Sequence, residues 1–186
     1  MADSLIFLDL TLKGKAVKGD SVVNGFKGLI ELKSMHWRAS YKSPFESLPG
    51  DTAGGFRAGE NLSIEKYLDA STPLLMQLMD DRADSRTHTK EAEDKFKKDN
   101  RAVITVAALH GRSKNEAVNK LMEIELAGCR VKKISSKTGA GGLSISLDET
   151  LELDYLGFKL TYFQLNAKTD TRSRVSAPFA CLYRPK

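Results

Sequence analysis

The feature that most constrains the fold is a strand-like segment that begins at Leu62 and leads directly into the one strong helix signal of the chain. Leu62 and Ile64 alternate with polar neighbours, which is typical of a half-buried strand. Ser71 or Thr72 is the expected N-cap, with Pro73 at the first helical position, where its missing N–H needs no partner. Apolar side chains then recur at helical spacing, and they are Leu74, Leu75, Leu78 and Met79. We therefore expect a helix that lies with one face across a sheet.

The same stretch resembles the central motif of the haemolysin-coregulated proteins, the Hcp family of type VI secretion. After a strand, that family has lysine, an aromatic residue, aspartate, serine, proline and leucine at this spacing. The matching positions in this chain are Lys66, Tyr67, Asp69, Ser71, Pro73 and Leu75. The resemblance implies a structural role for the motif, in which Asp69, Ser71 and Pro73 fix the start of the helix.

The N-terminal part of the chain predicts two strands joined by a long loop. Residues 4–12 alternate as a strand would, and residues 29–40 predict a second strand. Its apolar positions change phase between Leu32 and Met35, which indicates a β-bulge. The connection at 13–28 contains four glycines, a density that predicts turns and a flexible loop.

This loop carries a second part of the family resemblance. Members of the family have glycine, an acidic residue and serine between their first two strands, and Gly19, Asp20 and Ser21 match that order. Their second strand ends in serine, tryptophan and glycine, whereas residues 36–38 are histidine, tryptophan and arginine. By the resemblance, Gly19, Asp20 and Ser21 are expected near the contact between stacked rings.

Two segments in the middle of the chain are expected to lie outside the sheet. Residues 41–60 hold two prolines and four glycines and predict a loop. Residues 80–101 hold seven acidic and seven basic side chains and predict a charged surface insertion, longer than in typical family members. A short solvated helix from Lys90 to Lys98 is the alternative.

The second half of the chain predicts further strands. Residues 102–109 are rich in β-formers, and residues 118–135 fit a strand pair or one bent strand, although helical spacing is also present. The family resemblance favours strand. Residues 139–142 predict a glycine loop. A phosphate-binding loop would need a helix directly after the glycines, and a strand is expected there instead. The long strand after this loop changes phase around Leu156 and Gly157, as in family members, which predicts a one-residue bulge.

Length and composition fit one domain with a sizeable core. The chain has 186 residues, of which 41% are hydrophobic and 28% are charged, values typical of globular proteins. No apolar run is long enough to span a membrane, and the N-terminus lacks the pattern of a secretory signal. We expect one mainly β domain over residues 1–186, a β-barrel or two-sheet sandwich with one external α-helix, resembling a phage tail-tube subunit.

The positive charge of the chain is concentrated at its C-terminal end. The formal net charge is +5, and residues 166–186 carry five basic groups and one acidic group. A basic chain can indicate nucleic-acid binding, but no nucleic-acid-binding motif is present. A basic tail that includes a last strand at 177–184 is the simpler interpretation, and no nucleic-acid partner is expected.

The residue types that carry chemistry do not form recognisable motifs. The histidines are far apart in sequence: His36, His88 and His110. None has a second ligand at metal spacing. Cys129 and Cys181 are expected to be buried free thiols, and a disulfide between them in an oxidising compartment is the alternative. The acidic residues of 148–154 fit the polar face of a strand better than a catalytic pair. The sequence therefore predicts no catalytic residue, metal or cofactor, and a protein that is not an enzyme.

The family resemblance implies a mechanical function. Hcp proteins form hexameric rings that stack into the inner tube of the type VI secretion system, with the sheath and spike proteins as partners. By this resemblance we expect a homohexamer that is made in the bacterial cytoplasm, is secreted without a signal peptide, carries small effector proteins in its lumen and contributes to virulence. The alternative is a monomeric secreted effector or accessory paralogue that has the same fold but does not stack.

Overall fold

The elements of the fold come from a computed structural model, which describes residues 4–41, 56–58, 62–79, 89–109, 118–141, 144–166 and 171–180. The strands are β1 (Ser4–Leu12), β2 (Lys15–Val17), β3 (Ile30–His36), β4 (Ala39–Tyr41), β5 (Phe56–Ala58), β6 (Leu62–Tyr67), β7 (Arg101–Leu109), β8 (Val118–Ala127), β9 (Arg130–Gly141), β10 (Ser144–Asp154), β11 (Gly157–Asn166) and β12 (Thr171–Ala180). The helices are α1 (Ser71–Met79) and α2 (Lys90–Asp99).

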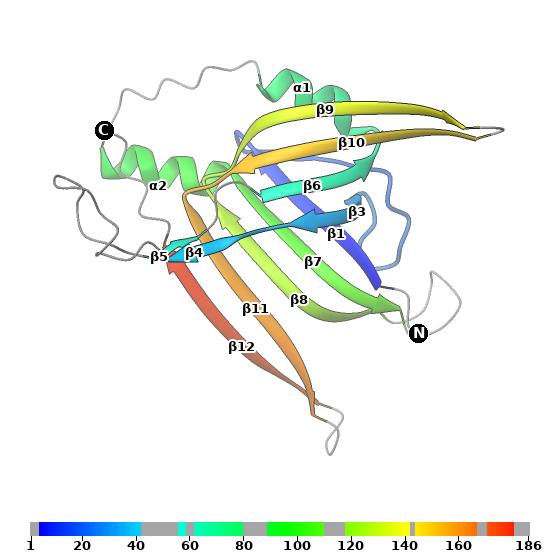
Figure 1. Ribbon diagram of the computed structural model, residues 1–186. Coiled ribbons are helices and arrows are strands. Elements are labelled where there is room, and N and C mark those ends of the chain that lie inside the picture. Colours follow the sequence, from blue (N-terminus) through cyan, green and yellow to red (C-terminus); the bar gives the residue numbers. More distant parts are fainter. Residues whose placement is uncertain are drawn as a thin grey trace.

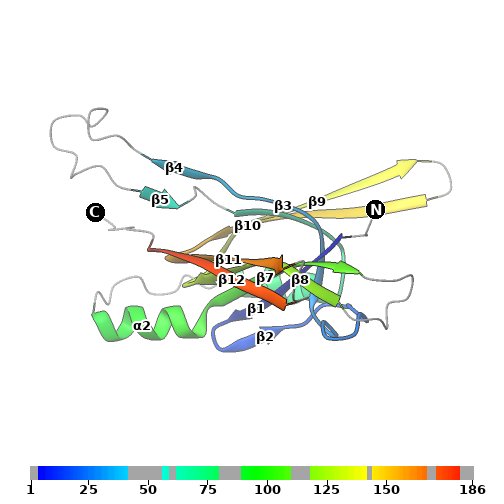
Figure 2. The same ribbon diagram turned by 90° about the horizontal axis from the view of Figure 1, so that it is seen from below.

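One antiparallel sheet, folded over on itself into two layers, forms the body of the molecule (Figure 2). Its strand order is β12-β11-β8-β7-β1-β3-β6-β10-β9, and β2 is added beside β1. The strands from β12 to β1 make one layer, and those from β3 to β9 make the other and cross the first at a large angle (Figure 1). The expected mainly β fold is confirmed.

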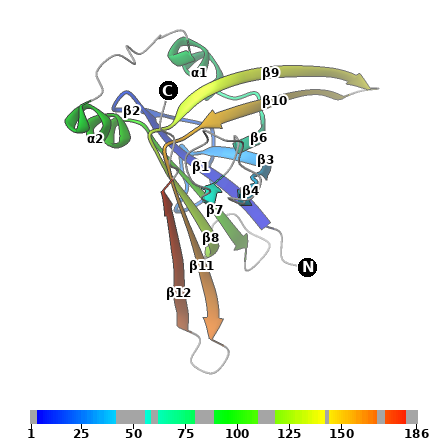
Figure 3. The same cartoon turned by 60° about the vertical axis from the view of Figure 1, so that its left-hand side comes forward.

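The main hydrophobic core lies between the two layers. Leu8, Leu10 and Leu12 alternate along β1 and are all buried in it, and Ile124 and Leu126 of β8 belong to the same cluster. Helix α1 closes one side of this core with Leu75, which is 1% exposed. Leu74 and Leu78 pack against the core as expected, whereas Met79, predicted on the same face, is exposed. Helix α1 lies outside the sheet beside β9 (Figure 3).

A smaller apolar cluster holds the β2–β3 connection against the outer face of β1 and β7. Val23 and Phe26 are buried there against Phe7 and Ala107. The rings of Phe7 and Phe26 stack with their centroids 4.2 Å apart. The prediction of a flexible loop over residues 13–28 is wrong, because its first part forms β2 and these two apolar side chains anchor the rest.

The chain passes between the two layers at two adjacent corners. One corner, at Gly128, joins β8 to β9, and the other, at Tyr155 and Leu156, joins β10 to β11. The two corners touch, since the backbone N–H of Leu156 donates to the carbonyl of Ala127 at 2.9 Å. The expected bulge near Gly157 is this second corner. The inward positions change phase there because β10 and β11 face the same core from opposite layers.

Several strand boundaries differ from the sequence-based prediction. Residues 56–58, expected as loop, form β5, which pairs with β4. The glycine segment expected as a loop at 139–142 continues β9 as far as Gly141, paired with β10. The last strand begins at Thr171 and ends at Ala180, earlier than the expected 177–184.

Other predictions for the sheet are confirmed. The register between β3 and β6 shifts between Leu32 and Ser34, where the change of phase indicated a bulge. Residues 118–135 form two strands and no helix, although β8 and β9 lie in different layers and do not pair with each other. Residues 80–88, 110–117 and 181–186, which include His88, His110 and Cys181, lie outside the described part of the chain.

The charged insertion contains a regular helix, α2, which agrees with the alternative of a short solvated helix at this position. The hydroxyl of Thr89 caps it by accepting from the backbone N–H of Ala92 at 3.3 Å. Acidic side chains occupy its first turn and basic ones its last, which complements the helix dipole. Its one aromatic residue, Phe96, contacts the body of the protein, with the Arg130 guanidinium 4.7 Å from the ring centroid.

The contact at the corner predicts different costs for two glycine substitutions at positive φ. Gly14 has φ +73° and open space where a Cβ would lie, whereas a Cβ on Gly128, φ +67°, would lie 2.9 Å from the Leu156 side chain. We expect Gly14→Ala to lower the free energy of unfolding by about 1–2 kcal/mol through backbone strain alone. Gly128→Ala should cost about 1–3 kcal/mol more through overpacking. Urea unfolding measures both, and equal losses would contradict the proposed contact.

Candidate functional site

The central sequence motif folds into a buried cluster of charged side chains beneath the start of α1. The side chains of Lys66 in β6 and Glu149 in β10 are each 1% exposed, and Lys66 Nζ lies 2.8 Å from Glu149 Oε2. Lys66 Nζ also lies 2.7 Å from Asp69 Oδ1 and donates to the Thr72 hydroxyl at 3.1 Å. Its remaining contact is the carbonyl of Tyr67 at 2.8 Å. The ammonium group is therefore fully surrounded by acceptors.

Both carboxylate oxygens of Glu149 are also satisfied. Oε2 accepts from the Thr72 hydroxyl at 2.6 Å, and Oε1 accepts from the Ser136 hydroxyl at 3.1 Å. The expectation that Glu149 belongs to a polar strand face is wrong, because it is buried and paired with Lys66. Alternation with the buried Leu151 and Leu153 marks Glu149 as inward-facing. No local signal reveals its partner, since even Thr72, which is nearer in sequence than Lys66, is 77 positions away from Glu149.

Two aspartates accept hydrogen bonds from the backbone at the start of α1. Asp69 lies just before the helix, and Asp20 lies in the connection between β2 and β3. Asp69 Oδ1 accepts from the backbone N–H of Ser71 at 3.0 Å, and Asp20 Oδ2 accepts from that of Ala70 at 3.1 Å. The helix begins at Ser71, so the predicted cap at Ser71 or Thr72 is placed too late. Pro73 is thus the third helical residue, which still belongs to the first four whose N–H groups have no helical partner.

The loop residues matched to the family lie directly beside this motif. A Cβ on Gly19 would lie 2.6 Å from Ile30 Cα and 2.8 Å from Asp69 Oδ2, so only glycine allows the loop to approach so closely. Ser21 is buried, and its backbone N–H donates to the carbonyl of Leu29 at 3.1 Å. Gly19 and Ser21 are thus packed against the body of the protein, whereas Asp20 is exposed and contacts it through the bond from Ala70. The neighbouring Val22 is 63% exposed.

A patch of exposed apolar side chains lies at the end of β6, beside the buried cluster. It is formed by Tyr67, Leu68 and Leu147, and the backbone N–H of Leu68 donates to the carbonyl of Leu147 at 3.0 Å. The Lys33 ammonium lies 3.9 Å from the Tyr67 ring centroid and forms an ion pair with Asp148.

No arrangement of metal ligands is found among the described residues. Within those ranges, no group of three or more histidine, cysteine or acidic side chains could hold a metal ion. His36 is exposed at the end of β3, and Cys129 is a buried free thiol, as expected. In the same part of the chain, no helix is long and apolar enough to cross a membrane.

Comparison with known proteins agrees with the resemblance seen in the sequence. The family model described as type VI secretion system effector, Hcp, matches residues 9–162. No curated protein matches the sequence. Among solved structures, Hcp1 from Salmonella typhimurium is 19% identical, with 97% of this chain and 95% of that chain covered and a TM-score of 0.61.

Two further solved structures have the same fold. A type six secretion system protein is 16% identical over 95% of this chain and 93% of its own, with a TM-score of 0.66. Hcp1 from E. coli EAEC 042 is 16% identical over 94% and 98% of the two chains, with a TM-score of 0.61. At these identities the similarity shows the fold alone.

The buried cluster predicts that Lys66→Met is strongly destabilising. Removing the ammonium leaves the Glu149 carboxylate buried without its cation, which costs about 3–5 kcal/mol in comparable pairs. Lys33→Met is the matched control, because its pair with Asp148 is partly exposed and such pairs contribute little to stability. The double variant Lys66→Met/Glu149→Leu should recover part of the loss. Urea unfolding at fixed protein concentration measures all three, and similar losses for Lys66→Met and Lys33→Met would refute the role given to the cluster.

Proposed function

The chain belongs to the Hcp family of the type VI secretion system, and we propose that it is a ring-forming structural subunit of the inner tube of that system. The observation that carries the proposal is the family match over residues 9–162. Proteins of this family are structural tube proteins that the type VI system secretes. In this function the chain transmits force and encloses a channel, and it catalyses no reaction.

The sheet supports assembly into a ring. Among the described strands, β9 and β12 each pair with a single neighbour, so each leaves a row of backbone N–H and C=O groups at an edge. A head-to-tail contact between copies closes into a ring when the rotation between neighbours permits it. The exposed patch of Tyr67, Leu68 and Leu147 adds apolar area for such a contact. Six copies per ring is the number proposed from the family.

The loop at 18–28 is proposed to form the contact between stacked rings. Gly19, Asp20 and Ser21 lie near that contact and hold the loop in place through the bonds to Ala70 and Leu29. Val22, which is exposed, is the side chain proposed to touch the next ring. A rigid loop suits this role, because little conformational entropy is lost when it binds.

The remaining partners are proposed from the family. The whole chain, residues 1–186, is proposed to act as one domain that is made in the bacterial cytoplasm and then exported without a signal peptide. Sheath and spike proteins are the proposed partners of the stacked tube, and small effector proteins are proposed to occupy the lumen. Acidic side chains on the outward faces of β8 and β10, such as Glu123 and Glu152, suit a hydrated surface.

The proposed hexameric ring has a definite expected mass in solution. Light scattering after size exclusion should give six times the 20.5 kDa mass of one chain, and negative-stain images of the same peak should show a central hole. A monomer at high protein concentration would contradict the ring as the working form. It would favour the monomeric effector or accessory paralogue.

The proposed stacking contact predicts the effect of charge at the loop tip. Val22→Asp places a carboxylate on an exposed side chain, so we expect an intact fold and intact rings but shorter tubes, because the charge must be desolvated at the contact. Val22→Thr, which has the same shape, is the control and should stack nearly as well as the wild type. Tube length is measured by electron microscopy at equal protein concentration. Unchanged tubes for Val22→Asp would place the contact elsewhere.

A further inference from the structure

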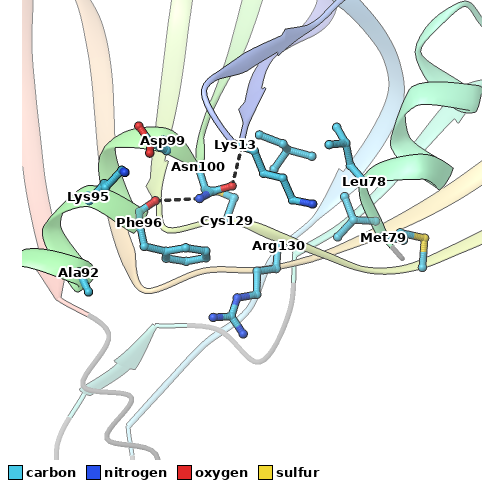
Figure 4. A pocket seen from close by; sticks show the side chains of 12 residues that line it. Lys13, Leu78, Met79, Ala92, Lys95, Phe96, Asp99, Asn100, Cys129 and Arg130 are labelled. Carbon is cyan, nitrogen blue, oxygen red and sulfur yellow. Dashed lines mark hydrogen bonds between the residues drawn. The ribbon is translucent and has the colours of Figure 1, made fainter. Parts of the chain in front are cut away.

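A cavity of about 590 Å³ opens between the end of α1, helix α2 and the beginning of β9. Its volume falls within the range of about 300–1,000 Å³ that is usual for small-molecule sites. The side chains around it come from segments far apart in sequence, which include the β1–β2 turn at Lys13 and the β8–β9 corner at Cys129 (Figure 4). Neither the motif at Lys66 nor the exposed patch at Tyr67 contributes to its lining.

Asn100, the residue after α2, holds the walls of the cavity in place. Its Oδ1 accepts from the backbone N–H of Lys13 at 2.9 Å, and its Nδ2 donates to the carbonyl of Phe96 at 3.0 Å (Figure 4). Its own carbonyl accepts from the N–H of Cys129 at 2.9 Å. One buried residue thus joins α2 and the β1–β2 turn through its side chain and the β8–β9 corner through its backbone carbonyl. The cavity is therefore formed before any ligand binds.

The inner surface of the cavity is apolar. It includes Leu12, Leu78 and Val131, which belong to or pack against the main core. Cys129 also lines it, and burial raises the pKa of its thiol to about 12. The thiol is therefore neutral near pH 7 and behaves as a small apolar group there. Such a surface favours the hydrocarbon part of a ligand.

The rim of the cavity is positively charged. Lys13, Lys95 and Arg130 line it together with a single carboxylate, Asp99. Within the described residues, no carboxylate forms an ion pair with Lys95 or Arg130. The Arg130 guanidinium is held over the Phe96 ring. A planar guanidinium fixed in this way is suited to bind a carboxylate through two parallel hydrogen bonds.

We propose that this cavity binds a small amphipathic anion, namely an aliphatic carboxylate of medium chain length. The chain lies on the apolar surface formed by Leu12, Leu78 and Val131, and the carboxylate binds at Arg130 in the positive field of Lys13 and Lys95. The proposal is independent of ring assembly, because it rests on a cavity within one chain.

The first test is a calorimetric titration of the full-length protein with decanoate. We expect one saturable site per chain. Decanol has the same chain without the charge, and inorganic phosphate has charge without the chain, so each should bind at least about tenfold more weakly. The absence of a saturable site for decanoate at millimolar concentration would overturn the proposal. Equal binding of decanol would also overturn it.

Variants then locate the site. Arg130→Gln should weaken decanoate binding about tenfold or more, whereas Lys132→Gln, an exposed neighbour on β9 that does not line the cavity, should leave it unchanged. Ala92→Trp should abolish binding by filling the space. It is expected to fold, since Ala92 lies on a helix without buried residues. Equal effects of the Arg130 and Lys132 variants, or full binding by Ala92→Trp, would overturn the proposed site.

Discussion

The ion pair between Lys66 and Glu149 is the interaction on which the surrounding structure depends. A charge that is 1% exposed must keep its partners, because leaving either one alone in the interior costs several kcal/mol. Lys66 comes from β6 and Glu149 from β10, and Thr72 of α1 bonds to both. Two strands and a helix are therefore held in one arrangement by directional contacts. Asp69 extends this constraint to the β2–β3 loop, because Gly19 packs against it.

The parts of this fold that follow from sequence are those encoded by neighbouring residues. Alternation in β1 identifies Leu8, Leu10 and Leu12 as core residues, and the spacing after Pro73 identifies α1. The motif itself is visible in sequence as Lys66 and Asp69, three positions apart. Glu149 is in phase with the buried Leu151 and Leu153, so alternation along β10 places it on the inward face but does not identify its partner. Only the pairing of β6 with β10, set by the whole sheet, brings Glu149 to Lys66.

The errors of the sequence analysis also have physical causes. A change of phase in an apolar pattern can arise from an extra residue within one strand or from a strand that changes layers. The patterns at Leu32 and at Leu156 are alike, yet the first is a bulge and the second is a corner. Glycine-rich composition likewise conceals that Val23 and Phe26 anchor the loop at 18–28. In each case tertiary packing, which acts over long sequence separations, selects between local alternatives.

The two proposed roles use different parts of the molecule. The ring and the stacked tube rely on the sheet edges, the loop tip at Val22 and the patch near Tyr67. The cavity relies on α2 and on Asn100, which attach a charged segment to the corner where β8 passes into β9. A helix with no buried residue adds little to the hydrophobic core. Charged residues on α2 such as Lys95 can therefore be substituted without loss of the fold. This tolerance allows a binding site to evolve on a structural protein.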